Sequence, residues 1–294
     1  MENTSCIICH KNNTVVVSTK AIVHKQGQEV EATNVLCRTC GLVFMNPRPS
    51  EVEYQDIYKR YSEERHSHNT SEAIIEYIKS VENKSKGKSV AEFLRPHIRI
   101  GGRALDIGAG IGVLAAALND HLKIDVVAIE PGVLLSKVAS EYYKLPFFNG
   151  NFDQYVVAHP NERFDLIVLH HVFEHFSDPM KELAKLQQSL TPNGILYIEV
   201  PNILDFKKPV NQFFDLLHPF SYSPATLNQV LKMGGFKIIA WNKNKHWRIQ
   251  IIAAPMEDAR PAVGGETNSR FTAVRTRMFL LKRRLVDRLK SIFK

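Results

Sequence analysis

The sequence predicts an α/β fold, in which helices cover both faces of a mostly parallel seven-stranded sheet that follows a small cysteine-bearing N-terminal module. Three observations predict it. From residue 103 onward, short apolar runs alternate with helical segments, which is typical of a parallel sheet wrapped on both faces. A glycine-rich stretch, LDIGAGIG, joins the first apolar run to the first helical segment. All four cysteines of the chain lie within residues 1–45.

The apolar runs and the segments between them predict the elements of the sheet domain. Strands are expected at 103–108, 125–130, 145–150, 164–170, 194–200, 236–242 and 248–254, and helices at 111–120, 133–143, 178–190 and 223–233. The segment between the last two runs has no room for a helix. The last strand is therefore expected to be antiparallel, because a parallel crossover needs roughly a dozen residues or more.

The remaining segments complete a prediction of four units. NPRPS (46–50) is a turn-forming stretch, and residues 50–82 are expected to be helical from the N-cap Ser50. Residues 82–89, ENKSKGKS, predict a linker or exposed loop. The expected units are a cysteine module (1–45), a helical cap and linker (46–97), the sheet domain (98–255) and a basic amphipathic helix (256–294).

The composition excludes several classes of protein. Hydrophobic residues make up 44% of the chain, which is ample for a packed core. The sequence contains no uninterrupted apolar run of about 18 residues and no apolar signal-peptide core at its start, so we expect a cytoplasmic protein. Residues 268–294 hold nine Lys or Arg and one Asp, which equals the whole net charge of +8. The body of the chain therefore needs no anionic partner.

The glycine-rich turn predicts a ligand that approaches the backbone closely. Glycine allows positive φ and has no Cβ in the way, and the amides at the following helix start favour an electronegative group. Asp106 lies within the turn, where an acid repels a pyrophosphate and suits an ammonium or sulfonium group. Glu130 ends the second strand, where a carboxylate can hold both hydroxyls of a ribose. A tight turn without a ligand is the alternative interpretation.

LDIGAGIG, followed by AIEPG, FDLIVLHHVFEHFSDP and LTPNGILYIEVPN, resembles the class I S-adenosylmethionine-dependent methyltransferases over about residues 90–255. The resemblance implies a Rossmann-like fold, S-adenosyl-L-methionine as cofactor and methyl transfer to an acceptor. The resemblance implies that the turn holds the methionine end of the cofactor, that Glu130 holds the ribose, and that residues 151–153 lie against the adenine. The family usually has an acid where this chain has an amide, at Asn151. The cofactor-binding residues that the resemblance implies are Asp106, Gly108, Gly110, Glu130, Asn151, Phe152 and His170.

Two other functions share parts of this pattern. An NAD(P)-dependent oxidoreductase has a similar first strand and helix, but here the spacing is G-x-G-x-G rather than G-x-G-x-x-G. A non-catalytic protein that keeps the cofactor fold as a binding scaffold is the second alternative. The acids at 106 and 130 and the HHVFEH stretch argue against it.

The four cysteines predict a structural zinc site. Cys6-x-x-Cys9 and Cys37-x-x-Cys40 form two knuckles that can close a tetrahedral site of four thiolates, which leaves no open position on the metal. Because residues 1–45 have too little apolar material for a core of their own, metal binding would stabilise them. A redox dithiol or four unrelated thiols is the alternative. CRTCGLVFMNPRPS and the tyrosine-bearing helix after it resemble the zinc module of bacterial methyltransferases of sugar pathways.

The HHVFEH stretch supplies the candidate catalytic residues. His171, Glu174 and His175 project to one side if the segment turns helically, and we expect His175 to be the base, with His171 as the alternative base and Glu174 as an orienting carboxylate. Two other roles stay open: the pair braces the loop, or it helps to hold a divalent cation. Residues 212–224 are expected to wall the acceptor pocket, with His218 facing it, unless their aromatic rings pack in the core.

The tyrosine-bearing helix and the C-terminal segment have expected roles outside the sheet. In the resembling family the helix that holds Tyr54, Tyr58 and Tyr61 folds over the cofactor as a lid; ordinary amphipathic packing is the alternative. The C-terminal segment is expected to form one helix with basic flanks, typical of a helix on an anionic membrane surface. A partner or a second copy of the chain in a homo-oligomer is the alternative there, and nucleic acid is the least favoured because no recognition module accompanies the charge. Its apolar stripe is Phe271, Val274, Met278, Leu281, Leu285 and Ile292.

The resulting hypothesis is a methyltransferase that acts on a sugar, a glycan or a lipid-linked glycan precursor, and that lies in the cytoplasm or peripherally on the inner face of the membrane. Some proteins with a similar zinc module methylate a sugar carbon and carry a further C-terminal domain. Too few residues follow the last predicted strand to form such a domain, so we expect an oxygen or nitrogen acceptor.

Overall fold

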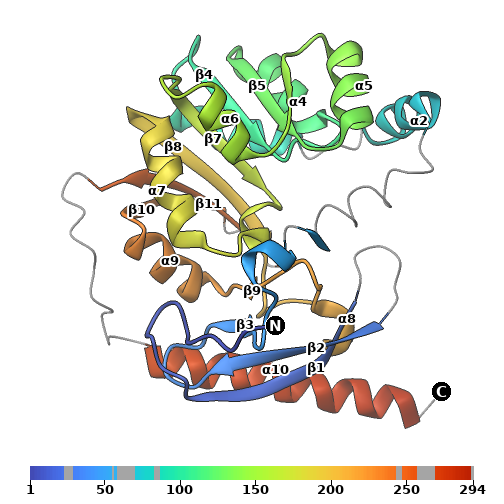
Figure 1. Cartoon of the computed structure of the whole chain (residues 1–294), viewed down its shortest axis with the longest axis vertical. Coiled ribbons are helices and arrows are strands. Elements are labelled where there is room, and N and C mark those ends of the chain that lie inside the picture. Colours follow the sequence, from blue (N-terminus) through green and yellow to red (C-terminus); the bar gives the residue numbers. More distant parts are fainter. Residues whose placement is uncertain are drawn as a thin grey trace.

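The chain folds around two sheets (Figure 1). A computed structural model describes all residues except 23–28, 55, 58–69, 83–86, 243–246, 257–268 and 293–294. The strands of the larger sheet are β4 (Arg103–Ile107), β5 (Asp125–Glu130), β6 (Phe147–Asn149), β7 (Phe164–His170), β8 (Leu190–Pro201), β10 (Phe236–Trp241) and β11 (Arg248–Pro255). Their order is β10-β11-β8-β7-β4-β5-β6. β11 is antiparallel to both of its neighbours, and the other pairs are parallel, so the predicted sheet is confirmed.

Helices cover both faces of this sheet. They are α3 (Gly87–Leu94), α4 (Val113–Leu122), α5 (Val133–Tyr143), α6 (Phe152–Ala158), α7 (Pro179–Ser189) and α9 (Pro224–Met233). On β7 the buried side chains alternate between two cores. Leu166 and Val168 pack with α3 and α4, whereas Ile167 and Leu169 pack with α6, α7 and α9. A strand that is buried on both faces needs apolar residues at every position, which is why LIVL reads as a continuous run.

The predicted helices of the sheet domain are confirmed to within about two residues, and two predictions around them need correction. α2 (Ser71–Glu82) and residues 51–54 are helical parts of the expected 50–82 helix, whereas Tyr58 and Tyr61 lie outside the described residues. Residues 87–89, expected in a linker, begin α3, whose apolar side chains are buried against α4. The helix η1 (Arg95–His97) follows directly. Sequence patterns also missed α6, which has only seven residues.

The N-terminal residues form three strands of a second sheet that the sequence pattern did not reveal. β1 (Thr14–Ile22) pairs with β2 (Glu29–Cys37), which pairs with β3 (Val43–Met45). The fourth strand, β9 (Phe220–Ser221), comes from the segment after β8. Phe206 and Phe214 from that segment, together with Leu280 near the C-terminus, complete the core of this sheet. The cysteine module thus has no core of its own and shares one with distant segments.

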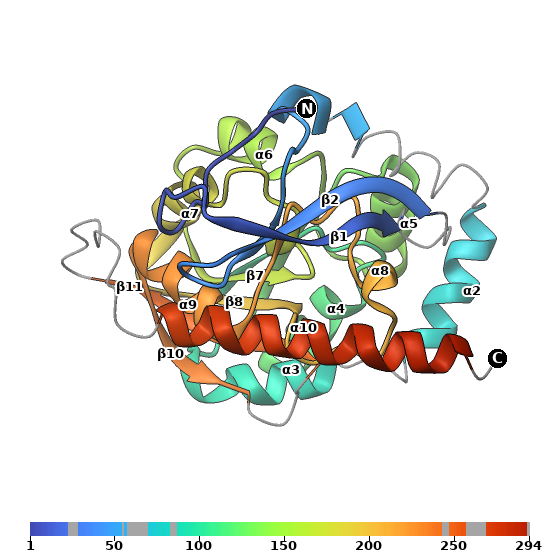
Figure 2. The same cartoon turned by 90° about the horizontal axis from the view of Figure 1, so that it is seen from below.

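The C-terminal segment forms one helix, α10 (Ser269–Ile292), which lies against the smaller sheet and α8 (Val210–Phe213) (Figures 1 and 2). Gly41, with a φ of +83°, lets the helix approach closely, since a Cβ there would lie 2.8 Å from the amide nitrogen of Ala273. Thr276 and Leu280 are buried on the same side of the helix. None of the helices in the described part of the chain combines the length and apolar content of a membrane span.

Candidate active site

The glycine-rich turn leaves one stretch of bare backbone at the carboxyl end of β4. Gly108, Gly110 and Gly112 all have positive φ, which disfavours any residue with a side chain. A Cβ on Gly108 would lie 2.7 Å from Val172, and one on Gly112 would lie 2.8 Å from Phe147, so packing alone requires these two glycines. A Cβ on Gly110 would meet no protein atom within 4 Å. Gly110 is therefore the position where a ligand, rather than the protein, can fill the space.

Asp106 is a buried carboxyl group in this turn, and the described residues place no cationic partner beside it. It is 1% exposed, and its Oδ2 atom has no hydrogen-bond partner. Burial, with a smaller effect of the negative charge of Glu130, raises its pKa to about 8. A buried acid with an unpaired oxygen fits a positively charged ligand group, which would both pair the oxygen and stabilise the carboxylate.

Glu130 joins the glycine turn to the end of β5. Its two carboxylate oxygens accept hydrogen bonds from the amides of Gly110 and Gly132, each at 2.8 Å. These bonds fix the carboxylate directly beside the bare backbone of Gly110. A carboxylate has about four acceptor sites, so the arrangement fits a ribose that approaches with its two hydroxyls.

A cavity of about 120 Å³ lies beside this turn and brings several predicted residues together. Gly108, Asn151, Phe152 and His175 all line it. Asn151 is the N-cap of α6 and forms a capping box with Gln154, so the amide at this position starts the helix that forms one wall. The lining also includes Tyr54, Ile129, Pro131, Asp153, Val172 and Phe176.

His171 lies between two buried carboxylates. Its backbone φ is +59°, a strained conformation for a residue with a side chain. Nδ1 lies 3.1 Å from Glu174 and Nε2 lies 3.2 Å from Glu199. Burial opposes protonation of His171, but the hydrogen bonds to Glu174 and Glu199 outweigh it and raise its pKa to about 9. At neutral pH this imidazole is therefore positively charged.

Glu199 is the centre of this network and was not among the sequence-predicted residues. Its side chain is fully buried on β8 and binds Arg248, Gln250 and the hydroxyl of Tyr197. Burial by itself raises the pKa of Glu199, but the hydrogen bonds from His170 and His171 and the charge of Arg248 hold it well below its ordinary value. The signal in the sequence was a lone acid within the apolar run GILYIEV.

His170, expected at the cofactor, contacts the Glu199 network. Its Nε2 is 3.4 Å from Glu199, its ring is 5.0 Å from that of His171, and it does not line the cavity beside the glycine turn.

His175 is held by the segment that follows β8. It ends the short helix η2 (Phe173–His175), and its Nδ1 lies 2.8 Å from the carbonyl oxygen of Leu217. Because a carbonyl only accepts hydrogen bonds, Nδ1 carries a proton, and in the neutral tautomer Nε2 is therefore the nitrogen that can accept one. The hydroxyl of Tyr54 donates to the same carbonyl. The ring of His218 is 4.7 Å away, whereas Phe214 and Phe220 of this segment are buried in the core.

A second cavity, of about 450 Å³, opens at the same edge of the sheet on the other side of β8. Arg248 lines it and also contacts Glu199, so it connects this cavity with the histidines. Most of the other lining side chains are polar or aromatic: Asn202, Asp205, Trp241, Asn242, Gln250 and Arg275.

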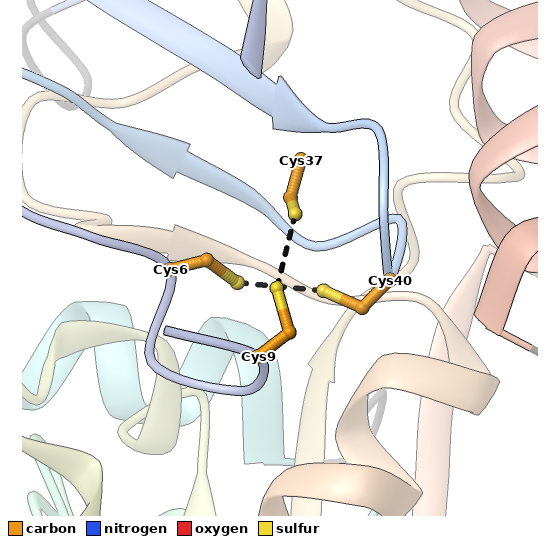
Figure 3. Close-up of side chains that lie close together, drawn as sticks. All are labelled: Cys6, Cys9, Cys37 and Cys40. Carbon is orange, nitrogen blue, oxygen red and sulfur yellow. Dashed lines mark hydrogen bonds between the residues drawn. The ribbon is translucent and has the colours of Figure 1, made fainter. Parts of the chain in front are cut away.

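The four cysteines converge between the two knuckles (Figure 3). The Sγ atoms of Cys6 and Cys40 are 3.4 Å apart, and those of Cys9 and Cys37 are 3.5 Å apart. All four are free thiols within 4.8 Å of one another. A tetrahedral zinc ion with Zn–S bonds of about 2.3 Å separates its sulfur ligands by about 3.8 Å. The donor set therefore fits a zinc ion.

The chain belongs to the methyltransferase domain family, whose model it matches over residues 74–240. With the seven-stranded sheet and the glycine turn at the end of β4, this defines a class I S-adenosylmethionine-dependent methyltransferase. The predicted class and fold are thus confirmed, and the oxidoreductase alternative is set aside.

Three relatives illustrate the similarity. The chain is 26% identical over 164 residues to the ubiquinone biosynthesis O-methyltransferase of Coxiella burnetii, a match that covers 50% of this chain and 69% of the relative. It is 30% identical over 103 residues to the enzyme of that name from Rhodopseudomonas palustris, covering 34% of this chain and 40% of the relative. Its structure resembles 1,6-didemethyltoxoflavin-N1-methyltransferase of Burkholderia thailandensis, solved with bound 1,6-didemethyltoxoflavin and S-adenosylhomocysteine. The TM-score is 0.54 and the identity 14%, over 82% of this chain and 100% of that one, a likeness of fold.

Proposed function

We propose that the chain transfers a methyl group from S-adenosylmethionine to a hydroxyl oxygen of a sugar, a glycan or a lipid-linked glycan precursor, with His175 as the base. The observation that carries the proposal is the position of His175. It lines the cavity beside Gly108, and its Nδ1–H donates to the carbonyl of Leu217. The same role serves an amino acceptor, which is the nitrogen alternative.

Three groups at the glycine turn would hold the cofactor, which supplies an electrophilic methyl group on a positively charged sulfur. Asp106 would pair with the ammonium of the methionine end, an assignment that its unpartnered buried oxygen supports. Gly110 gives room for close approach, and Glu130 binds the ribose hydroxyls. Asn151 and Phe152 are the cavity residues assigned to the adenine.

The raised pKa of His171 and the hydrogen bond of His175 favour His175 as the base. His171, with a pKa of about 9, already carries a proton at neutral pH and cannot take another from the acceptor. His175 keeps an acceptor nitrogen, because its other nitrogen donates to a carbonyl. Glu174 lies with His175 and His218 in one cluster. Burial raises the pKa of Glu174, but the hydrogen bond with His171 and the positive charge of that ring outweigh burial and lower the pKa. Glu174 therefore stays ionised and can stabilise a protonated His175.

The cavity beyond β8 supports a sugar as the acceptor. Its side chains include amides, a carboxylate and an indole, which can hydrogen-bond hydroxyls and pack against the apolar face of a sugar ring. Arg248 links this cavity to Glu199 and so to His171. Both curated relatives are O-methyltransferases by name, which supports an oxygen as the acceptor atom.

A divalent cation is the competing role for the same cluster. Glu174, His175 and His218 each offer one donor atom within 4.8 Å of the others, and a cation there would polarise the acceptor hydroxyl. The two roles exclude each other, since a cation bound at Nε2 of His175 removes the base. Turnover that does not change when Mg²⁺ is added or omitted supports the base; turnover that requires Mg²⁺ supports the cation.

We also propose that Cys6, Cys9, Cys37 and Cys40 bind one structural zinc ion. Two observations support it: the sulfur–sulfur distances, and the residue after each knuckle, His10 or Gly41, which has positive φ and turns the chain back toward the metal. Four thiolates complete the coordination, so the ion takes no part in the chemistry.

The proposed function is tested by the formation of S-adenosylhomocysteine from S-adenosylmethionine. The acceptors are nucleoside-diphosphate sugars and polyprenyl-linked sugars, with catechol as a phenolic comparison. With an accepted sugar, His175→Ala should lower turnover at least about 100-fold, the range for a general base, while S-adenosylhomocysteine affinity changes little. His97→Ala, at an exposed site distant in sequence, is the matched control. Near-normal turnover of His175→Ala, or methylation of catechol and of no sugar, would contradict the proposal.

A further inference from the structure

Helix α10 has two apolar faces, and the described residues of the protein cover one of them and leave the other exposed. Thr272, Ala273, Thr276 and Leu280 are buried against the smaller sheet and its neighbours. On the opposite side, five large apolar side chains form a stripe along the helix, which we call the outer stripe. Its members and their exposed fractions are Phe271 (69%), Val274 (53%), Met278 (65%), Leu281 (54%) and Leu285 (60%). A continuous row of this kind marks an interaction site, whereas single exposed apolar residues do not.

Basic side chains border the outer stripe on both sides. With 3.6 residues per turn, residues seven apart lie on the same line of a helix. Arg277 and Arg284 therefore form one border, and Arg275 and Lys282 form the other; all four are exposed. The acidic residue of the described helix, Asp287, faces away from the stripe, because it accepts a hydrogen bond from the amide of Val210 and pairs with Arg283.

The charges beside the outer stripe favour a membrane over a second copy of the chain as its binding partner. If two copies of the chain met through their outer stripes, the Arg and Lys borders of one would face those of the other in either orientation, with no acidic side chain on that face to compensate. Like charges at such a distance repel. An anionic lipid surface complements both parts at once, because its acyl region accepts the apolar row and its headgroups pair with both basic borders.

We propose that α10 binds the surface of an anionic membrane and buries the outer stripe at the boundary between headgroups and acyl chains. The other face of the helix anchors it to the cysteine module. The close contact at Gly41 and the hydrogen bonds from Arg283 to the carbonyls of Lys207 and Lys208 fix its orientation. The enzyme therefore meets the membrane with a defined side.

The orientation has a consequence that rests on the proposed function. Arg275, on one border of the stripe, also lines the 450 Å³ cavity assigned to the acceptor. Docking through α10 therefore brings the entrance of that cavity to the headgroup level. A sugar attached to a membrane lipid is the acceptor class that this placement serves.

Membrane binding is tested with the full, zinc-loaded chain by co-sedimentation with vesicles, without cofactor or acceptor. Vesicles of phosphatidylcholine with phosphatidylglycerol should bind the protein, and binding should weaken with salt; pure phosphatidylcholine should bind it far less. The double variant Met278→Glu/Leu281→Glu should lower affinity for the anionic vesicles more than about tenfold, since two apolar side chains no longer enter the membrane. Ile100→Glu/Val157→Glu, at exposed apolar residues outside α10, is the matched control and should bind normally.

Equal binding of the two double variants would overturn the proposal. The absence of wild-type binding to anionic vesicles would also overturn it. This includes the case in which the outer stripe holds a dimer that Met278→Glu/Leu281→Glu dissociates. Thermal unfolding of each variant checks that it folds. Because no turnover is measured, the result does not depend on the acceptor. A second measurement covers the link to the acceptor: the α10 variant should methylate a short-chain, water-soluble lipid-linked sugar normally and a vesicle-borne one at least about tenfold more slowly.

Discussion

Replacing Gly110 with alanine separates cofactor binding from folding. The backbone there has a φ of +58°, and a Cβ would find no protein atom within 4 Å. The cost to the fold is therefore only that of a side chain in the left-handed region, about 1–2 kcal/mol. For a chain of this size that corresponds to a fall in melting temperature of roughly 2–8 °C.

Gly101→Ala is the matched control for this cost. Gly101 also has a positive φ, +78°, and a Cβ there also meets nothing within 4 Å, but it lies in the turn before β4 and not at the carboxyl end of the sheet. Both variants should lose a similar amount of stability. Only the methyl group on Gly110 occupies the space assigned to the cofactor.

Isothermal titration with S-adenosylhomocysteine measures the difference. In Gly110→Ala, the added methyl group prevents close approach to the backbone and should weaken S-adenosylhomocysteine binding at least about tenfold, or about 1.4 kcal/mol. The affinity of Gly101→Ala should stay near that of the wild type. If the two variants bind equally well, Gly110 is only a turn residue and the cofactor lies elsewhere.

Three further predictions concern the buried charges and the cysteines. Because the pKa of Asp106 is raised to about 8 without a cationic ligand, binding should release a proton, so affinity for S-adenosylhomocysteine should rise about tenfold per pH unit between pH 6 and 8; a flat profile in wild type, or the same slope in Asp106→Asn, would contradict this. Glu199→Gln leaves Arg248 buried without its partner and should cost about 3–5 kcal/mol in urea unfolding at pH 6. Part of this stabilisation comes from the pair of Glu199 with His171, whose pKa in the folded chain is raised from 6.5 to about 9. This part is complete below pH 6.5 and is lost as the pH rises through about 9, so the difference in unfolding free energy between variant and wild type should narrow across that range. A constant difference would contradict the charged pair. Metal analysis should find about one zinc per chain and less in Cys9→Ser, and the same metal content in both would refute the cysteine site.

The sheet domain was predictable because its signals are local. A strand buried on both faces reads as a continuous apolar run, and the turn after β4 has positive φ at three alternate positions, each of which the sequence fills with glycine. Both signals lie within a few residues of each other. The class of enzyme was implied by the resemblance of four such stretches to a known family, not by the strand pattern alone.

The smaller sheet was not predictable because its partners are far apart in the sequence. β3 pairs with β9, which is two residues long and separated from it by most of the chain. Leu280 from α10 fills the same core. Periodicity therefore predicted that α10 is a helix with an exposed apolar stripe. It did not predict the opposite face, which holds two threonines and Leu280, because that face is recognisable only from its contact with the smaller sheet.

The candidate catalytic cluster was predictable in part. HHVFEH marked His171, Glu174 and His175, but the distinction between the two histidines depends on partners from other strands and loops. Glu199, on β8, makes His171 a cation, and the carbonyl of Leu217 leaves His175 with an acceptor nitrogen. The HHVFEH stretch alone does not reveal these contacts, because both partners come from other parts of the chain.

The central claim is that the carboxyl end of β4 and β5 holds S-adenosylmethionine by its charges and its bare backbone. A crystal structure of the full chain with S-adenosylhomocysteine tests it most directly. We expect the ligand's amino group within hydrogen-bond distance of Asp106, its ribose hydroxyls within such distance of Glu130, and no protein side chain between the ligand and Gly110. A ligand that lies elsewhere, or that leaves Asp106 without a partner, would show that these groups do not bind the cofactor.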